Sequence, residues 1–214
     1  MEGILFVMSG PSGAGKTTIV KGALKELEDV EFSISYTTRP KRRGEIDGKD
    51  YFFISEEEFK ALKKRGEFLE WQEVHGHLYG TSKRYVRSRM KNGVNVLLDI
   101  DVKGAMSVKR QIKEAVFIFV APPSFKELKE RLIKRHTEGK ADLEKRIEDA
   151  RYELSMISEF DYLIVNYDVN QSIKQLESII IAEQIKVSRW GEFVGKYKFY
   201  KNVERRRDRE GEDL

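Results

Sequence analysis

The sequence lacks cysteine, and none of its apolar stretches approaches the ~20 residues that a membrane-spanning helix needs. Without cysteine the chain can form neither disulfide bonds nor thiolate metal sites. The start, MEGILFVMSG, contains an acidic residue, and its apolar run is too short for the central region of a signal peptide. These absences predict a cytoplasmic protein with no membrane among its partners.

The composition is that of a folded protein with a densely charged surface. In 214 residues, 40% are hydrophobic, which is enough for one large domain or for a core with small insertions. Charged residues of both signs make up 36% of the chain, and the formal net charge is +4. This mild basic bias is weaker than nucleic-acid binding usually requires, so we expect no nucleic-acid partner.

Short apolar runs alternate with helical patterns along most of the chain. The runs at 4–8, 94–100, 115–121 and 162–166 are typical of strands that are buried on both faces, and a helical pattern follows each of them. A long helix is expected over about 170–190. This alternation predicts an α/β fold with a central parallel sheet flanked by helices.

Two segments interrupt the alternation. FSISY, DYFFI and EFLEWQEV indicate shorter, half-polar strands around a helix that begins with a capping box, Ser55 and Glu58. In RLIKRHTEGKADLEKRIEDARYEL, two charged helical patterns flank a break, as in a flap that closes over a site. We therefore predict a core (1–32, 85–122 and 148–190), a small mixed α/β insertion (33–84), a helical lid (123–147) and a charged, partly flexible tail (191–214).

The stretch GPSGAGKT has the spacing G-x-x-x-x-G-K-[ST] and lies between a predicted strand and a predicted helix. Glycines let backbone N–H groups turn inward around phosphate oxygens, and the helix N-terminus adds partial positive charge. This context favours a nucleotide-phosphate site over a glycine-rich turn without a ligand. The predicted nucleotide-binding residues are Gly10, Pro11, Ser12, Gly13, Ala14, Gly15, Lys16, Thr17 and Thr18, with Lys16 directed to the β- and γ-phosphates and Thr17 to Mg²⁺.

Asp99 and Asp101 end the predicted strand VNVLLDI, at the edge of the sheet where open α/β folds bind ligands. Carboxylates at this edge can hold Mg²⁺ or its water molecules, or can contact a substrate. The sequence leaves open which of the two aspartates has which role.

The stretch TTRPKRRGE concentrates four cations in five positions and has three interpretations: a solvated loop, a nucleic-acid patch or a clamp for a small anion. A nucleoside triphosphate site alone fits a kinase, a GTPase or a mechanical ATPase. If the phosphoryl acceptor is itself a phosphate, its charge must be neutralised and it needs no base. Arg39 and Arg42, with the hydroxyls of Tyr51 and Tyr79, make such an acceptor pocket plausible.

Taken together, these motifs resemble guanylate kinase over residues 3–190. The likeness rests on GPSGAGKT, SYTTRPKRRGE, GKDYFF, EFLEW, YGT, LLDID, the flap arginines and VNYD, in this order. It implies a P-loop kinase core with a GMP-binding insertion and a lid that closes during turnover. It also implies transfer of the ATP γ-phosphate directly to GMP or dGMP with Mg²⁺, by a monomer or a homodimer.

The resemblance assigns roles to individual residues. Arg39, Arg42, Tyr51 and Tyr79 would hold the GMP phosphate, and Ser35, Glu70, Thr81 and Asp99 or Asp101 would surround guanine. Among these, Glu70 could accept from N1–H and the 2-amino group of guanine, and the Thr81 hydroxyl could donate to O6. Asn166 would contact adenine, and Arg135 would either reach the triphosphate or stack on adenine. The metal ligands would be Thr17 and Asp99, and the catalytic cations would be Lys16, Arg39, Arg131, Arg135 and Arg146.

Three other functions compete with this interpretation. A guanylate-kinase-like binding module without catalysis would be expected to have a degraded phosphate cradle, whereas GPSGAGKT is intact. A kinase for another phosphorylated acceptor would not need Glu70, Thr81 and Asp101 together. A nucleic-acid role for the cation run is the weakest of the three, because Glu45, Asp47 and Asp50 follow it at once.

Overall fold

The structure is a computed structural model that describes residues 2–74, 76–134 and 140–197. In this part of the chain, a central sheet of parallel strands has the order β2-β7-β1-β8-β9. The strands with predicted counterparts are β1 (Leu5–Ser9), β7 (Asn95–Asp99), β8 (Val116–Ala121) and β9 (Tyr162–Val165), so all four are strands as predicted. The predicted burial on both faces is confirmed for β1, β7 and β8 but is wrong for β9, which lies at the edge of the sheet and has Leu163 50% exposed. The edge strand β2 (Val30–Phe32) precedes them in the order.

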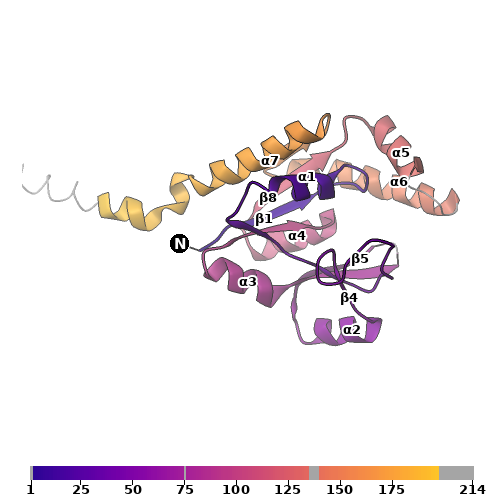
Figure 1. Ribbon diagram of the computed structural model, residues 1–214, viewed down its shortest axis with the longest axis horizontal. Helices are drawn as coiled ribbons and strands as arrows, with labels where there is room; N and C mark the ends of the chain where they lie inside the picture. The colour runs from indigo at the N-terminus through magenta and orange to yellow at the C-terminus, as the bar shows by residue number, and fades with distance from the viewer. Residues whose placement is uncertain (1, 75, 135–139, 198–214) are drawn as a thin grey trace, which may run out of the picture.

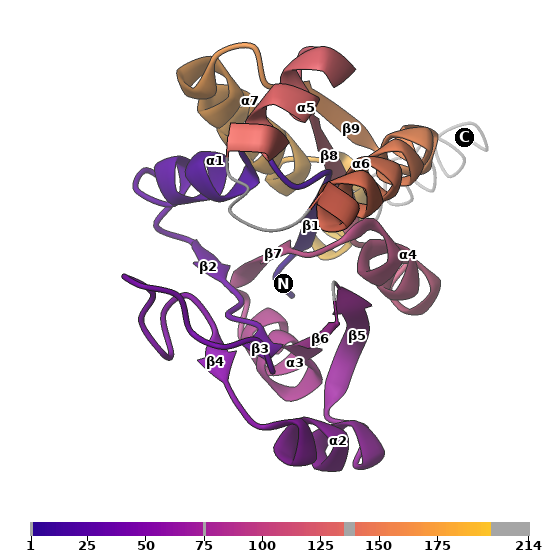
Figure 2. The same cartoon turned by 90° about the vertical axis from the view of Figure 1, so that its right-hand side faces the viewer.

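Helices cover both faces of the central sheet, as predicted (Figures 1 and 2). Phe6 and Met8 of β1 pack with α1 (Lys16–Ala23) and α7 (Val169–Gln184) in one apolar cluster. Leu5 and Val7 point to the other face and pack with α3 (Lys83–Lys91) and α4 (Val102–Gln111). Successive strand residues face opposite sides, so the apolar run of β1 supplies both halves of the core.

A second, mixed sheet has the order β4-β3-β6-β5 and lies below the central sheet in Figure 1. It consists of β3 (Tyr36–Thr37), β4 (Phe52–Phe53), β5 (Phe68–Val74) and β6 (His77–Ser82), with α2 (Glu56–Lys64) beside it. The predicted capping box is confirmed, because Ser55 Oγ accepts from Glu58 N and the Glu58 carboxylate accepts from Ser55 N. The sequence analysis did not predict β6.

The predicted strand FSISY differs from the structure. Phe32 ends β2 in the central sheet, Tyr36 begins β3 in the second sheet, and residues 33–35 belong to neither strand. The backbone N–H of Ser33 donates to Leu97 O at the end of β2, and the chain then passes from one sheet to the other. A single half-polar run therefore contributes to both sheets.

The predicted flap corresponds to α5 (Phe125–Lys134) and α6 (Lys140–Ser155), which pack through Leu128, Leu132 and Ala150. The predicted break, HTEGKAD, lies partly in 135–139, outside the described residues, and α6 begins within it. Leu154, near the end of α6, packs against Phe119 of the central sheet. The lid boundary at 147 thus falls inside a helix, and the domain boundaries stay a prediction.

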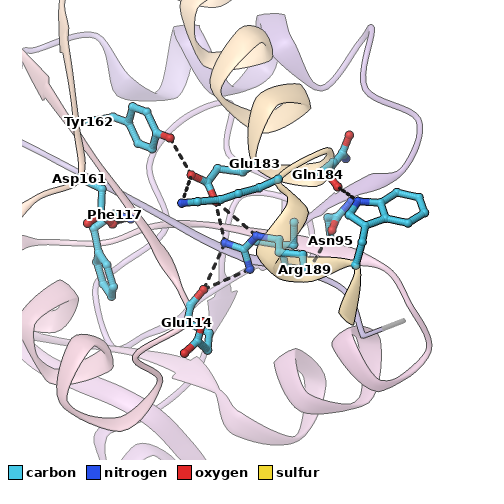
Figure 3. Close-up of polar contacts among 11 residues, drawn as sticks. Asn95, Glu114, Phe117, Asp161, Tyr162, Glu183, Gln184 and Arg189 are labelled. Atoms are coloured by element: carbon cyan, nitrogen blue, oxygen red, sulfur yellow. Dashed lines mark hydrogen bonds and ion pairs between the residues drawn. The ribbon is translucent and has the colours of Figure 1, made fainter. Parts of the chain in front are cut away.

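The C-terminal part of the described chain is anchored by a buried carboxylate. Glu183 of α7 is 3% exposed and accepts hydrogen bonds from Tyr162 Oη at 2.6 Å, Lys186 Nζ at 3.1 Å and Arg189 Nη2 at 2.8 Å (Figure 3). These contacts tie the 3₁₀ turn η2 (Val187–Arg189) to the edge of the sheet. The helix predicted over about 170–190 ends at Gln184, and η2 begins three residues later, at Val187.

Residues 191–197 are helical, within the segment that the sequence analysis predicted as a charged, partly flexible tail. The ring of Phe193 contacts the rings of Trp190 and Tyr197, with centroids 6.0 and 5.1 Å apart. The remaining tail, 198–214, lies outside the described residues. Among the helices that the structure describes, none is long and apolar enough to cross a membrane.

Candidate active site

The phosphate cradle joins β1 to α1 at the carboxyl edge of the central sheet. Gly10 and Gly15 have φ values of 138° and 98°, which favour glycine. An added Cβ would lie 2.1 Å from Val120 O at position 10 and 2.3 Å from Asn166 Nδ2 at position 15. The two glycines are therefore required by the backbone conformation and by the close approach of β8 and Asn166.

Lys16 points into the cradle from the first turn of α1. Its Nζ donates to Gly10 O and lies 3.9 Å from Asp99 Oδ1 at the end of β7. Burial raises the pKa of Asp99, and the positive charge of Lys16 opposes this change. The structure thus brings the lysine of the cradle and the aspartate of LLDID together at the carboxyl edge of the sheet, where the sequence analysis expected the aspartate.

Glu70 of β5 and Thr81 of β6 face each other across an antiparallel register pair. The Glu70 carboxylate is 5% exposed, and its Oε1 accepts from Thr81 Oγ1 at 2.6 Å. Burial raises the pKa of Glu70 to about 7, and the negative charge of Asp101 adds to this effect. Asp101 is the N-cap of α4 and accepts from Gly104 N at 3.0 Å.

Arg39 is held by a residue that the sequence analysis treated only as a neighbouring negative charge. Its Nη2 and Nη1 donate to Glu45 Oε1 and Oε2 at 2.7 and 3.0 Å, and its guanidinium lies 5.4 Å from the centre of the Tyr51 ring. Glu45 Oε2 also accepts from Arg42 N at 2.7 Å. The hydrogen bond from Arg39 holds the pKa of Glu45 below its usual range. Glu45 therefore links the Arg39 side chain to the backbone of Arg42 within residues 39–45, the cation loop.

Tyr51 and Tyr79 lie together beside this loop, with ring centroids 5.9 Å apart. Burial raises the pKa of Tyr51 to about 12, and Asp99 adds to the effect. The Tyr51 hydroxyl therefore stays protonated at neutral pH and can donate a hydrogen bond to an anion.

Most of the predicted site residues line one cavity of about 1000 Å³. It extends from the phosphate cradle past the ends of β7 and β5 to the cation loop and to α6. The predicted residues that line it are Gly10, Pro11, Ser12, Gly13, Gly15, Lys16, Thr17, Thr18, Ser35, Arg42, Tyr51, Glu70, Tyr79, Asp99, Asp101 and Arg146.

Several predicted residues lie behind this lining. Arg39 and Thr81 are buried against Glu45 and Glu70, which hold them in place. Ala14 lies in the cradle, where its backbone N–H donates to Pro11 O at 3.1 Å.

Asn166 follows β9, and its side chain is 7% exposed. Its Nδ2 donates to Ala14 O at 2.7 Å, and its Oδ1 accepts from Ser172 Oγ at 3.2 Å. In this structure Asn166 braces the phosphate cradle. The sequence analysis did not foresee this contact, because it joins residues far apart in the chain.

Two flap arginines also reach the cradle. Arg146 Nη2 donates to Ser12 Oγ at 2.9 Å, and Arg131 Nη1 donates to Gly13 O at 3.3 Å. Arg131 also pairs with Glu127 on its own helix, at 3.2 Å. The third predicted flap arginine, Arg135, lies outside the described residues.

The cavity includes residues that the sequence analysis missed. Asp149 and Glu153 follow Arg146 on α6 at helical spacing and line the same cavity, opposite Lys103 of α4. Burial raises the pKa of Glu153 to about 7, Lys16 opposes this change, and Asp101 and Asp149 add to it. The signal was the i, i+3, i+7 spacing in RIEDARYE, but this spacing is equally typical of a solvated helix face.

Thr17 and Asp99 fit a magnesium ion by their chemistry. Mg²⁺ at phosphate sites is held by one or two protein oxygen ligands, by substrate phosphates and by water molecules. Both side chains line the cavity beside Lys16 and offer a hydroxyl and a carboxylate oxygen. The described residues contain no cluster of three or more His, Asp or Glu side chains that could hold a metal by itself.

Comparison with known proteins agrees with this geometry. The guanylate kinase family model matches residues 3–183. The guanylate kinase of Thermotoga maritima is 53% identical over 198 residues, which cover 92% of this chain and 96% of that protein. The guanylate kinase of Caldanaerobacter subterraneus is 47% identical, over 88% of this chain and 91% of its own length.

A solved structure gives the same result for the fold. The crystal structure of guanylate kinase from Anaplasma phagocytophilum superimposes with a TM-score of 0.73 at 35% sequence identity, covering 86% of this chain and 88% of that chain. Together with the matches in sequence, this similarity of fold shows the family of the chain. The chain belongs to the guanylate kinase family, the ATP:GMP phosphotransferases among the nucleoside monophosphate kinases.

Proposed function

We propose that the chain transfers the γ-phosphate of ATP directly to the phosphate of GMP or dGMP, in line and without a covalent intermediate. The products are ADP and GDP or dGDP. One observation carries the proposal: the buried carboxylate Glu70 lines the same cavity as Lys16 of the phosphate cradle. The residue proposed to recognise the base, Glu70, and the proposed triphosphate site at Lys16 thus line the same cavity.

The cradle would hold the ATP phosphates through backbone N–H groups and the N-terminus of α1. Lys16 would leave Gly10 O and bond the β- and γ-phosphates. Asn166 would support ATP binding by bracing Ala14 O, and its contact with adenine stays a prediction. Thr17 and Asp99 would hold Mg²⁺, which neutralises phosphate charge when bound.

Guanine recognition would depend on Glu70. An ionised carboxylate accepts from N1–H and from the 2-amino group, which lie side by side on guanine. Adenine presents an acceptor at N1 and has no 2-amino group, so it would leave the buried Glu70 unpaired. Ser35 and Asp101 would complete this pocket. The Thr81 hydroxyl has one hydrogen and donates it to Glu70 Oε1, so Thr81 would hold the Glu70 carboxylate in place and would not donate to guanine O6, the role that the resemblance implied.

The GMP phosphate would lie at the cation loop. Arg42, Tyr51 and Tyr79 line the cavity there and can donate hydrogen bonds. Arg39 would contribute from a buried position next to these residues. Glu45 accepts hydrogen bonds from both terminal nitrogens of the Arg39 guanidinium, and the remaining N–H groups of Arg39 would be available to the phosphate. Because the acceptor is already an anion, the step needs charge neutralisation and no general base.

The lid would supply the remaining cations. Arg131 and Arg146 approach the cradle from α5 and α6, where they would neutralise charge on the phosphoryl group in transit. Arg135 belongs to the same proposal by resemblance. Closure of the lid would exclude water, which otherwise competes with GMP for the γ-phosphate. The cytoplasmic location and the choice between monomer and homodimer stay predictions.

A coupled assay with ATP and a panel of acceptors tests the proposal. GMP and dGMP should be phosphorylated efficiently, IMP less so, and AMP and UMP poorly. Glu70→Ala should raise the KM for GMP far more than the KM for ATP, because it removes the acceptor for two guanine donors. Equal turnover of AMP and GMP by the unmodified protein would contradict the assignment of the base pocket. A complete lack of transfer would favour a binding module.

A further inference from the structure

Gly104 lies in the first turn of α4, between the two carboxylates assigned to guanine. Its backbone N–H donates to Asp101 Oδ1 at 3.0 Å. A Cβ atom added to Gly104 would lie 2.6 Å from Glu70 Oε2 and 3.3 Å from Glu70 Cδ. The first distance is shorter than real Cβ contacts, so any side chain at position 104 would have to displace the Glu70 carboxylate.

The backbone itself does not require glycine here. Gly104 is not among the described glycines with positive φ, and it lies inside a regular helix. Glycine is the poorest helix former apart from proline, so helix propensity favours alanine at this position. The feature that distinguishes glycine at position 104 is therefore the space that it leaves for Glu70.

Glu70 has little freedom to move away from an added methyl group. Its other carboxylate oxygen, Oε1, accepts from Thr81 Oγ1 at 2.6 Å. α4 is held against β5 by the hydrogen bond from Gln111 Nε2 to Leu69 O at 2.8 Å, and the two elements lie side by side in Figure 2. An added methyl would therefore act on the orientation of the carboxylate more than on the spacing of the elements.

We propose that Gly104 is a specificity-determining positioning residue. The space above its Cα sets the orientation of the Glu70 carboxylate, and its N–H fixes Asp101, so that both acids face the base. This inference rests on the proposed function, because it assumes that Glu70 binds guanine. Gly104 itself is not among the described residues that line the cavity.

The orientation of the Glu70 carboxylate can be measured through the two hydrogen bonds that it would accept from guanine. Two parallel hydrogen bonds to N1–H and the 2-amino group require both carboxylate oxygens to lie near the plane of the base. Hypoxanthine, the base of IMP, keeps N1–H but lacks the 2-amino group and can use one of these bonds. The ratio of kcat/KM for GMP to that for IMP therefore reports on the second hydrogen bond.

The decisive experiment is Gly104→Ala in the full chain, assayed with GMP, IMP and ATP. We expect the GMP:IMP ratio to fall roughly 10- to 100-fold, the effect of losing one hydrogen bond to a charged group. The KM for ATP should change little. Gly191→Ala is the matched control, because an added Cβ there meets no atom within 4 Å. An unchanged ratio in Gly104→Ala would overturn the proposal.

A double-mutant cycle separates positioning from a general defect of α4. Glu70→Asp shortens the side chain by one methylene group, so the methyl of Gly104→Ala would no longer meet a carboxylate oxygen. The effect of Gly104→Ala on GMP binding should then largely disappear in the Glu70→Asp background. If Gly104→Ala alone lowers the melting temperature, Glu70→Asp should restore it. Equal effects in both backgrounds would refute the coupling.

The unmodified protein distinguishes a failure of this inference from a failure of the proposed function. If it prefers GMP over IMP and AMP while Gly104→Ala keeps the same preference, Glu70 binds guanine and Gly104 does not position it. If the unmodified protein shows no preference for GMP, the proposed base pocket is wrong, and the inference about Gly104 fails with it.

Discussion

Replacing Glu70 with glutamine separates the effect of this carboxylate on stability from its effect on binding. Burial raises the pKa of Glu70 to about 7, whereas the ordinary value is 4.5. The folded state therefore binds the proton more tightly than the unfolded state does. The free energy of unfolding that depends on Glu70 is greatest below pH 4.5, falls as the pH rises from 4.5 to about 7, and is constant above this range.

The size of the effect follows from the two pKa values. A difference of roughly 2.5 at 1.36 kcal/mol per pKa unit corresponds to about 3 kcal/mol. Glutamine is neutral at every pH, and its Oε1 can still accept from Thr81 Oγ1. Glu70→Gln should therefore be more stable than the unmodified protein at pH 8 by up to about 3 kcal/mol, and the difference should vanish near pH 4.5.

Urea unfolding at a series of pH values from 4.5 to 8.5 measures this difference directly. The same variant should bind GMP poorly, because the glutamine NH₂ group faces the donors of guanine. Glu67→Gln is a control for charge removal near the same strand. A stability difference that does not change with pH would refute the argument from burial, and so would greater stability of the unmodified protein at pH 8.

Three further predictions concern the cradle and the cation loop. Lys16→Ala should lower kcat by at least about 100-fold with the fold retained, and near-normal turnover would exclude the proposed transfer. Asn166→Ala should lower the free energy of unfolding by about 1–3 kcal/mol, because Ala14 O loses its buried donor, and should raise the KM for ATP more than that for GMP. Glu45→Gln should raise the KM for GMP about tenfold through looser placement of Arg39. A lower KM would instead mean that Glu45 competes with the GMP phosphate, and steady-state kinetics with both substrates distinguishes the outcomes.

The sequence was sufficient to predict those structural elements and site residues whose pattern lies within a short stretch of the chain. The apolar runs that become β1, β7 and β8 are buried on both faces, so each is apolar at nearly every position. The run that becomes β9 is also apolar, although Leu163 is exposed there at the edge of the sheet. The cradle and the capping box at Ser55 depend on residues within eight positions of one another. Parallel strands bring their carboxyl ends to one edge, so the meeting of Lys16 and Asp99 could also be expected.

The sequence was insufficient to predict the role of a residue that depends on a partner far away in the chain. Strand β6 contains Gly80 and polar residues, and it is a strand because it pairs with β5 and β3. The brace from Asn166 to Ala14 joins residues 152 positions apart. Gly104 lies in a helix that an alanine would also form, and its role is visible only beside Glu70. Such roles depend on tertiary contacts that no local pattern encodes.

Two cations of the proposed site, Lys16 and Arg39, already have acceptors within the chain, and this would determine what a nucleotide must do when it binds. Lys16 bonds Gly10 O, and Arg39 bonds Glu45, so a phosphate must replace or share these acceptors and gains the difference between the two interactions. Arg146 differs, because its Nε is buried and has no hydrogen-bond partner among the described residues, while its Nη2 is held by Ser12. A phosphoryl oxygen beside Ser12 would satisfy this donor without displacing another acceptor. If the cradle binds phosphates as proposed, binding would therefore favour the position of α6 that places Arg146 beside Ser12.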